Sequence, residues 1–459
     1  MMSDWNGKRV LILGAARQGL ALARWLTLQG ARVTLSDMRS EAELLVARES
    51  LAGYPITWAL GGHPLKLLDS TDVLCLSGGV PLTLPIVVEA VKRGISLSND
   101  SQIFMEAVPC KTIGITGSSG KTTTTTLVGR MAKNAYGRKA YVGGNIGNPL
   151  INSVDTMKAD DVAILEFSSF QLEQMTVSPD VAAILNITPN HLDRHGSMEA
   201  YTAAKARILE FQGKEDAAVL GYHNKGAWNL RNKVHGRLYT FCLGELEEGL
   251  DGAYLQDGLL NLRDGETYLP LILREKILLR GDHNLLNVLA AFAIGHAAGF
   301  PLDAMLGAVE GFRGVPHRLE LVRELRGVRW YNDSIATAPE RSIAAIRAFE
   351  EPIVLLLGGR DKNLPWEDLM QLASRRVDHV VLFGEAAEKI EKTVDELGLR
   401  EKRFTLTRTD NLHEAVVQAA EVAESGDVVL LSPGGTSFDE FKDFEERGER
   451  FREWVQELS

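Results

Sequence analysis

The sequence predicts an α/β protein with three domains, each containing a mostly parallel sheet. Short apolar runs alternate with segments of helical length through most of the chain. This alternation favours parallel strands joined by crossover helices. The pattern starts afresh near residues 109 and 314. A length of 459 residues also suits two to four domains.

The strand-like runs define each predicted domain in turn. The first, residues 1–108, contains RVLILG, RVTLSD, DVLCLSGG and ISLSND. The second, residues 109–313, contains TIGITG, YVGGN, VAILEFSS and VAAILNIT, and its turn-rich stretch at 215–280 predicts a small antiparallel lobe. The third, residues 314–459, contains VRWYND, IVLLLGG, HVVLFG, RFTLTRT and VVLLSPGG.

Composition narrows the class of protein. Hydrophobic residues make up 45% and charged residues 24%, as in ordinary globular proteins, and the net charge of -11 argues against nucleic-acid binding. The three cysteines, Cys75, Cys110 and Cys242, lack metal-binding spacing and favour a reducing compartment. We expect no signal peptide, no membrane span and a cytoplasmic location, because no apolar run approaches the ~20 residues that a span needs.

The segment TIGITGSSGKTTTTT predicts a phosphate-binding loop between a strand and a helix. Gly117 and Gly120 let backbone N–H groups turn toward a polyphosphate, and the helix N-terminus adds its dipole. Lys121 supplies a charge for the β and γ phosphates and Thr122 a hydroxyl for Mg²⁺. The general motif has a glycine where Ile115 stands here, so this loop is a shorter form.

A second glycine turn, Gly14-Ala15-Ala16-Arg17-Gln18-Gly19, follows the first predicted strand, and Asp37 ends the next one. The spacing is close to the dinucleotide fingerprint. Ala16 replaces its middle glycine, however, which weakens NAD or FAD binding and leaves another nucleotide or a plain tight turn open.

Three residues of the second section are candidates for metal chemistry. Glu166 ends a strand beside the phosphate loop, where a carboxylate can bind Mg²⁺, although a solvated glutamate is the plain alternative. His191 follows the next strand, in NITPNHLDRHG. Lys205 lies in the helical segment YTAAKARIL, and residue chemistry alone favours nothing beyond a solvated lysine.

Taken together, these segments resemble the muramyl (Mur) ligases, ATP-dependent amide-forming enzymes of peptidoglycan precursor synthesis. The resemblance runs through the whole chain, in the blocks TGSSGKTTT, GGNIG, LEFSSFQLE, NITPNHLDRHGS, AAKARIL, GDHNLLNVLAA, PHRLE, NDSIAT, LLLGGRDKN and SPGGTSFDEFKDFEERGERF. It implies Rossmann-like N- and C-terminal domains around a central domain like a P-loop ATPase. The last block most resembles the D-glutamate-adding branch.

The resemblance implies substrates, ions and site residues. It implies ATP and UDP-N-acetylmuramoyl-L-alanine as substrates with D-glutamate, and two Mg²⁺ ions. We also expect a monomer. Residues expected at ATP are Gly117, Ser118, Ser119, Gly120, Lys121, Thr122, Thr123, Asn284, Asn287, Arg318 and Asp333. Those expected at the UDP substrate are Arg17, Gln18, Asp37, Arg39, Asn145 and His191. Those expected at D-glutamate are Thr337, Lys362, Ser437, Phe438 and Phe444. Metal ligands would be Thr122, Glu166, His191 and Lys205, the last as a carbamate, and the catalytic group would be Lys121, His191 and Lys205.

One position departs from the family pattern. The block that usually reads N-D-S-K-A-T has Ile335 in place of the lysine. Any contact made by that lysine must come from another group, such as Arg341 or Lys362, or be absent.

Three other functions stay open at this stage. The chain could add a different amino acid to a UDP-muramyl peptide or a folate, since the phosphate loop cannot separate these reactions. The N-terminal glycine turn leaves open the function of a nucleotide-dependent oxidoreductase, although Ala16 and the phosphate loop argue against it. Ile335 leaves a non-catalytic nucleotide-sensing protein.

Overall fold

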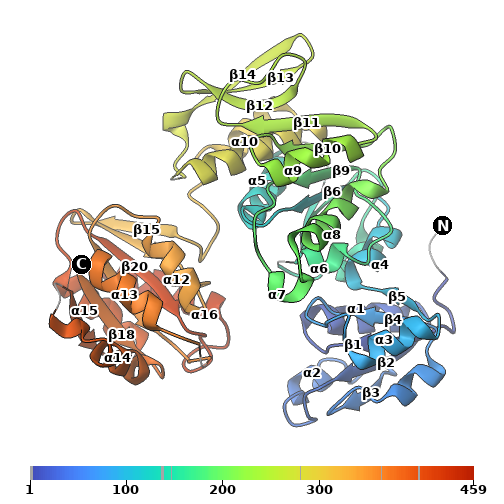
Figure 1. Cartoon of the computed structure of the whole chain (residues 1–459), viewed down its shortest axis with the longest axis horizontal. Helices are drawn as coiled ribbons and strands as arrows, with labels where there is room; N and C mark the ends of the chain where they lie inside the picture. The colour runs from blue at the N-terminus through green and yellow to red at the C-terminus, as the bar shows by residue number, and fades with distance from the viewer. Residues whose placement is uncertain (1–3, 136–138, 146, 280, 363, 402–403) are drawn as a thin grey trace. The chain divides into compact units, whose positions relative to one another are not determined.

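The chain divides into two compact units, Met1–Phe312 and Arg313–Ser459, which are described separately (Figure 1). The computed structural model describes residues 4–135, 139–145, 147–279, 281–362, 364–401 and 404–459. In the first unit two sheets follow one another along the chain, and the second unit contains a third. The predicted three-part α/β fold is thus confirmed, whereas the limits at residues 108 and 313 stay predictions.

The first sheet has five parallel strands in the order β3-β2-β1-β4-β5. Its strands are β1 (Arg9–Leu13), β2 (Arg32–Asp37), β3 (Thr57–Leu60), β4 (Val73–Leu76) and β5 (Ser96–Ser98). Its helices are α1 (Arg17–Leu28), α2 (Leu45–Glu49), the 3₁₀ turn η1 (Leu65–Ser70), α3 (Pro85–Lys92) and α4 (Asp100–Ala107). Gly14 turns β1 into α1 with φ +99°, and a Cβ on Gly19 would lie 1.9 Å from the Gly14 carbonyl oxygen. Both glycines are therefore needed for this close turn.

The second sheet has nine strands in the order β14-β13-β12-β11-β10-β9-β6-β8-β7. They are β6 (Lys111–Thr116), β7 (Ala140–Gly144), β8 (Val162–Glu166), β9 (Val181–Ile184), β10 (Ala217–Gly221), β11 (Arg237–Cys242), β12 (Asp251–Gln256), β13 (Leu259–Asp264) and β14 (Thr267–Leu273). Pairing is parallel from β7 to β12 and antiparallel only among β12, β13 and β14. An antiparallel part is confirmed at β12, β13 and β14, which form one edge of the large sheet. It does not extend over all of residues 215–280, because β10 and β11 pair in parallel.

Helices of this section flank the large sheet. They are α5 (Lys121–Asn134), α6 (Ser169–Leu172), α7 (Leu192–His195), α8 (Met198–Glu210), α9 (Lys225–Trp228), α10 (Asp282–Ala297) and α11 (Leu302–Val309), with 3₁₀ turns η2 (Leu150–Asn152), η3 (Val154–Thr156), η4 (Asn229–Lys233) and η5 (Arg274–Lys276). Both α10 and α11 pack against α5, the helix that follows the phosphate loop. Ten residues of α10 are buried, as expected for a helix that is apolar on most sides.

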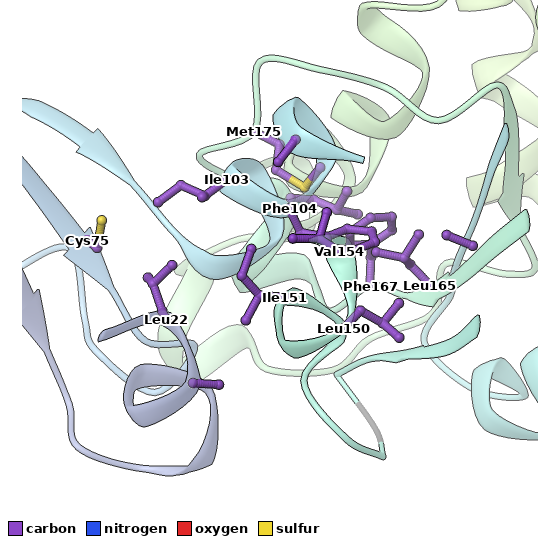
Figure 2. Packing of buried hydrophobic residues seen from close by; sticks show 14 of the residues in the cluster. Leu22, Cys75, Ile103, Phe104, Leu150, Ile151, Val154, Leu165, Phe167 and Met175 are labelled. Atoms are coloured by element: carbon purple, nitrogen blue, oxygen red, sulfur yellow. The ribbon is translucent and has the colours of Figure 1, made fainter. Parts of the chain in front are cut away.

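One hydrophobic core joins the first two sheets. Leu22 of α1 and Phe104 of α4 belong to the same buried cluster as Ile151 and Leu165 of the following section, and Figure 2 shows these side chains packed together. Polar contacts add to the join, since the Trp25 indole donates to an Asp155 carboxylate oxygen at 3.1 Å. This shared core makes residues 1–312 one compact unit.

The second unit contains a six-stranded sheet in the order β15-β16-β20-β17-β18-β19, antiparallel only between β15 and β16. Its strands are β15 (Glu320–Leu325), β16 (Val328–Asn332), β17 (Ile353–Gly358), β18 (His379–Phe383), β19 (Thr405–Arg408) and β20 (Val428–Gly434). Its helices are α12 (Pro339–Ile346), α13 (Glu367–Arg376), α14 (Ala387–Glu396), η6 (Leu399–Glu401), α15 (Leu412–Val422) and α16 (Phe444–Glu457). Alternate residues of β17 enter two separate cores, so both faces of this sheet are buried. Within the described residues, no helix has the length and hydropathy to cross a membrane.

Candidate active site

The phosphate loop occupies residues 117–120, between the end of β6 and the start of α5. Ile115 stands where the general motif has its first glycine, but here this position lies within β6 and is fully buried. The loop itself therefore begins later, at Gly117. Gly120 has φ +81°, a conformation that favours glycine. The loop thus places the N-terminus of α5 and its dipole at the carboxyl edge of the large sheet.

A neighbouring segment holds the loop in shape. The Ser119 N–H donates to the Asn186 side-chain oxygen at 2.9 Å, and the Asn186 amide donates back to the Ser119 carbonyl at 3.1 Å. The Ser118 hydroxyl donates to the Thr188 carbonyl at 3.0 Å. Asn186 was not among the predicted site residues, although it lies in the quoted block NITPNH. Its role depends on contact between β6 and β9, which sequence spacing does not reveal.

Two lysines meet at one carbonyl of this loop. Lys121 and Lys205 each place Nζ 3.0 Å from the Gly117 oxygen, and Lys205 also donates to the Thr116 hydroxyl at 3.2 Å. Lys205 is 1% exposed, so it is not the solvated lysine that residue chemistry alone favoured. Burial, followed by the nearby charge of Lys121, lowers the pKa of Lys205 to about 7.

Glu166 forms the acidic side of the same region. One carboxylate oxygen accepts from the Thr122 hydroxyl at 2.9 Å and the other from the Asn145 amide at 3.1 Å. Glu166 is 2% exposed, which excludes the plain reading of a solvated strand-end glutamate. Carboxylate and hydroxyl oxygens are ligands that Mg²⁺ accepts, with phosphate and water oxygens completing its shell. Within the described parts of the chain, no three His, Cys, Asp or Glu residues form a metal-binding group.

His191 stands in the loop before α7, with φ +53°. Its ring meets Phe170 edge-on with the centroids 5.3 Å apart. On Phe170 also lies His195, stacked at 5.0 Å, and a His195 ring nitrogen is 2.9 Å from the Ser169 hydroxyl. His191 is exposed and lies beside this aromatic cluster. Lys121, Lys205 and Glu166 lie instead at the phosphate loop itself.

Asn284 and Asn287, which are expected at ATP, lie in the first turns of α10. The Asn287 amide is 3.3 Å from the Asn284 side-chain oxygen. A Cβ on Gly120 would come within 2.2 Å of the Asn287 oxygen. The start of α10 thus abuts the phosphate loop, and Gly120 leaves room for that approach.

Predicted residues for the UDP substrate lie at the carboxyl edge of the first sheet. Arg39 forms two side-chain hydrogen bonds with Asp37, at 2.9 and 3.0 Å, and these hold the pKa of Asp37 well below its usual range. Asp37 also accepts from the Ala15 N–H at 2.7 Å, so it braces the glycine turn. The Gln18 amide donates to the Gly144 carbonyl at 2.6 Å, next to Asn145. Arg17, at the start of α1, is exposed.

In the second unit Asp333 is buried just after β16. The Ser432 hydroxyl donates to it at 2.8 Å and the Leu319 N–H at 3.2 Å. Burial raises the pKa of Asp333 to about 7, while the charges of Arg318 and Arg341 act in the opposite direction. A carboxylate here is thus close to its midpoint of ionisation at neutral pH.

The residues expected at D-glutamate come from three loops of this unit and from the start of α16. Arg360 and Thr436 exchange backbone hydrogen bonds at 2.8 and 2.9 Å, and the Gly434 N–H donates to the Ala336 carbonyl at 2.8 Å. These bonds tie together the segments that carry the predicted residues Thr337, Lys362 and Ser437. Ser437 is 2% exposed, whereas Phe438 is 58% exposed, and Phe444 packs edge-on against His317.

Arg341 supplies a cation near Ile335, the position at which the family pattern has a lysine. Its guanidinium donates to the Ile335 carbonyl at 3.0 Å, and its charge acts on Asp333. A cation therefore lies beside the loop in which the family pattern has a lysine. Lys362 is exposed in the neighbouring loop.

A further buried charge was not predicted. Arg447 of α16 is 0% exposed and hydrogen-bonds to Ser334 and Gly435. It lies in the run EERGER, whose alternating charges are typical of a solvated helix face. Nothing in that local pattern distinguishes a buried arginine from its exposed neighbours.

Comparison with known proteins gives consistent matches along the chain. Residues 8–99 match the MurD-like N-terminal domain of Mur ligases, residues 115–295 the Mur ligase middle domain, and residues 317–435 the Mur ligase glutamate ligase domain. The UDP-N-acetylmuramoylalanine--D-glutamate ligase of Caldanaerobacter subterraneus subsp. tengcongensis is 39% identical, with 98% of both chains covered. That of Acidobacterium capsulatum is 40% identical, with 98% of this chain and 97% of the relative covered.

Solved structures of similar fold agree with this. The UDP-N-acetylmuramate-alanine ligase MurC of Thermotoga maritima has a TM-score of 0.55 at 20% identity, covering 98% of this chain and 99% of the other. The MurF ligase of Thermotoga maritima, in complex with ADP, has a TM-score of 0.52 at 18% identity, with full coverage of both chains. At these identities the likeness concerns the fold.

Proposed function

The chain belongs to the Mur ligase family, and we propose that it uses ATP to join D-glutamate to UDP-N-acetylmuramoyl-L-alanine in peptidoglycan precursor synthesis. The observation that carries the proposal is the likeness over nearly the whole chain, at about 39% identity, to ligases named for this reaction. The geometry of the phosphate loop supports the use of ATP, because helix N-terminus, lysine and threonine lie where a polyphosphate would bind.

The reaction proceeds in two steps through an acyl phosphate. The terminal carboxylate of the UDP substrate attacks the γ-phosphorus, an acyl–phosphate bond forms, and ADP leaves with the electrons of the broken β,γ bond. Lys121 stabilises the negative charge that develops on the phosphate oxygens. The D-glutamate amine then attacks the acyl carbon, inorganic phosphate leaves, and the nitrogen gives up a proton.

Mg²⁺ would be held at two places near the loop. The buried Glu166 carboxylate and Thr122 hydroxyl, already 2.9 Å apart, suit one ion, and His191 with a modified Lys205 would serve a second. When bound, the ions neutralise charge on the phosphates. The role of the chain is to fix these oxygen donors beside the Lys121 ammonium.

We further propose that Lys205 is carbamylated. Burial and Lys121 disfavour its ammonium form, so a neutral amine is present near pH 7. Its nitrogen can attack CO₂, form an N–C bond and release a proton, which yields a carbamate anion. The change converts this amine into an anionic oxygen ligand beside the Lys121 ammonium.

The remaining site assignments are part of the same proposal. We assign the UDP substrate to residues 1–108, ATP to residues 109–313 and D-glutamate to residues 314–459, in a monomer that binds no nucleic acid. The use of ATP and a UDP-linked substrate favours the cytoplasm. In the N-terminal section, the Asp37–Arg39 pair and the Gln18–Gly144 bond favour a bracing role for Asp37 and Gln18 alongside any contact with the nucleotide.

An amino-acid panel tests the proposal. Purified protein is given ATP, Mg²⁺ and UDP-N-acetylmuramoyl-L-alanine with D-glutamate, L-glutamate, D-aspartate, L-lysine or meso-diaminopimelate, and phosphate and product mass are measured. We expect product with D-glutamate alone. Preference for another amino acid would overturn the substrate assignment, and nucleotide binding without any turnover would favour the non-catalytic reading. Binding of NAD(H) in place of the UDP substrate would favour an oxidoreductase.

A further inference from the structure

Arg447 is a buried cation at the centre of the second unit. It lies in the first turn of α16 and is 0% exposed, although arginine is rarely buried without an acidic partner. Its Nε donates to the Ser334 hydroxyl at 3.0 Å and Nη2 to the Ser334 carbonyl at 2.8 Å. Both terminal nitrogens donate to the Gly435 carbonyl, at 3.1 and 3.2 Å. All these acceptors are neutral.

The guanidinium touches the bases of three loops. Ser334 belongs to the loop after β16 and Gly435 to the loop after β20. The third is the loop after β17, where a Cβ on Gly359 would lie 2.8 Å from Nη1. Gly359 therefore leaves room for the arginine, so one side chain hydrogen-bonds to two loops and lies against the third.

These are the loops that carry the residues assigned to the amino acid. Thr337 lies three residues beyond Ser334, Lys362 three beyond Gly359, and Ser437 two beyond Gly435. Backbone hydrogen bonds between Arg360 and Thr436, and between Gly434 and Ala336, also connect these three loops to one another. A shift of the guanidinium would move all three residues relative to one another.

Chain stability alone gives a poor reason for a charge at this position. Burial of a cation is unfavourable, and an apolar side chain of similar volume is often neutral or stabilising in its place. Burial lowers the pKa of Arg447 to about 10, with Asp439 and Glu440 opposing this effect, so the guanidinium still keeps its proton at neutral pH. Its planar fork reaches several carbonyl oxygens at fixed angles, which a lysine cannot do.

We propose that Arg447 is a positioning residue for the amino-acid substrate, which sets D-glutamate affinity by holding the three loops in register without touching the substrate. This inference rests on the proposed function. Because the UDP substrate is assigned to the other unit, its affinity should not depend on Arg447.

The test compares Arg447→Lys with Arg323→Lys in the full-length enzyme. Arg323 of the same unit also donates to backbone carbonyls, those of Val455, Gln456 and Leu458, but these lie at the far end of α16. KM for D-glutamate, KM for the UDP substrate and kcat are measured by phosphate release. We expect Arg447→Lys to raise the D-glutamate KM about 10- to 100-fold, as for lost hydrogen bonds to a charged group, and to leave the KM of the UDP substrate unchanged. Arg323→Lys should change neither constant.

Several outcomes would overturn the inference. A purely structural role would lower kcat through the folded fraction and leave both KM values unchanged. An unchanged D-glutamate KM in Arg447→Lys would also contradict it. If that variant does not fold, Ser334→Ala, which removes one acceptor of Arg447, decides: a rise of about threefold in the D-glutamate KM supports the inference, and no rise overturns it. Absence of D-glutamate-dependent release by the wild type would instead overturn the proposed function, and the inference with it.

Discussion

The phosphate-loop region of the first unit and the loop junction of the second unit are built in opposite ways. The former is one continuous stretch, in which a strand, four loop residues and a helix start follow directly. The latter gathers segments near residues 334, 359 and 435 around a side chain from a fourth segment. The phosphate loop takes its geometry from its own backbone and from Asn186 of one neighbouring segment, whereas the loop junction takes it from packing between several segments.

The two regions also treat a buried cation differently. Lys205 lies beside a second lysine, and burial lowers its pKa to about 7. Arg447 is surrounded by carbonyl and hydroxyl oxygens and stays charged at neutral pH. Loss of charge prepares a group for chemistry, whereas a retained charge can hold loops together. The variants below separate these roles.

The largest expected effect is that of Lys121→Ala. Removal of the ammonium from the phosphate loop should lower kcat about 10³-fold, because the charge developing on the transferred phosphoryl group loses its partner. The measurement is phosphate release with all three substrates saturating. Lys133→Ala, at the exposed end of the same helix, should behave like the wild type. Retention of most activity by Lys121→Ala would remove this lysine from the mechanism.

Lys205→Ala should come next, with a loss of about 10²-fold through the missing anionic ligand. Formate or acetate should restore part of the rate, since a small carboxylate can occupy the space of the carbamate. The control is Lys111→Ala, at the start of the strand that leads into the loop. Wild-type activity of Lys205→Ala, or an activity of this variant that added formate or acetate does not raise, would contradict carbamylation.

Lys362→Ala probes the gathered site. Loss of this cation should raise the KM of D-glutamate at least tenfold, as for a broken charge-assisted hydrogen bond, and leave the KM of the UDP substrate unchanged. Lys392→Ala is the matched control, because Lys392 is exposed and pairs only with Glu396 among the described ion pairs. Equal changes in both KM values would argue against a separate amino-acid site.

The smallest effect concerns pH. Lys205 is protonated below its pKa of about 7, and an ammonium has no lone pair to attack CO₂. The wild-type rate should therefore fall as pH decreases through 7, by roughly tenfold at pH 6. Asp333, with its pKa raised to about 7, titrates in the same range. Lys205→Ala with added carboxylate separates the two groups. If the rate of this rescued variant no longer falls below pH 7, the fall in the wild type is due to Lys205. If the rate still falls, the fall is due to Asp333.

Sequence reasoning succeeded where local pattern determines structure. The strand ends at Asp37 and Glu166 and the helix around Lys205 were all predicted, because each follows from a short apolar run or helical period. It could not foresee that Asn186 clamps the loop through contact between β6 and β9.

Arg447 escaped prediction for a related reason. Its neighbours in EERGER are polar, so local pattern places it in solvent, and only the packing of α16 against the loops after β16 and β20 buries it. The burial of Lys205 likewise depends on how α8 meets the phosphate loop. Charges buried by tertiary contact carry no local signature.

Phosphate release from ATP in single-substrate omissions tests the central claim most directly. The enzyme is assayed in three reactions. One contains both co-substrates, one lacks only D-glutamate, and one lacks only UDP-N-acetylmuramoyl-L-alanine. We expect sustained phosphate release, together with product of the expected mass, only when both co-substrates are present. Sustained release without D-glutamate would contradict the assignment of the second unit to the incoming amino acid.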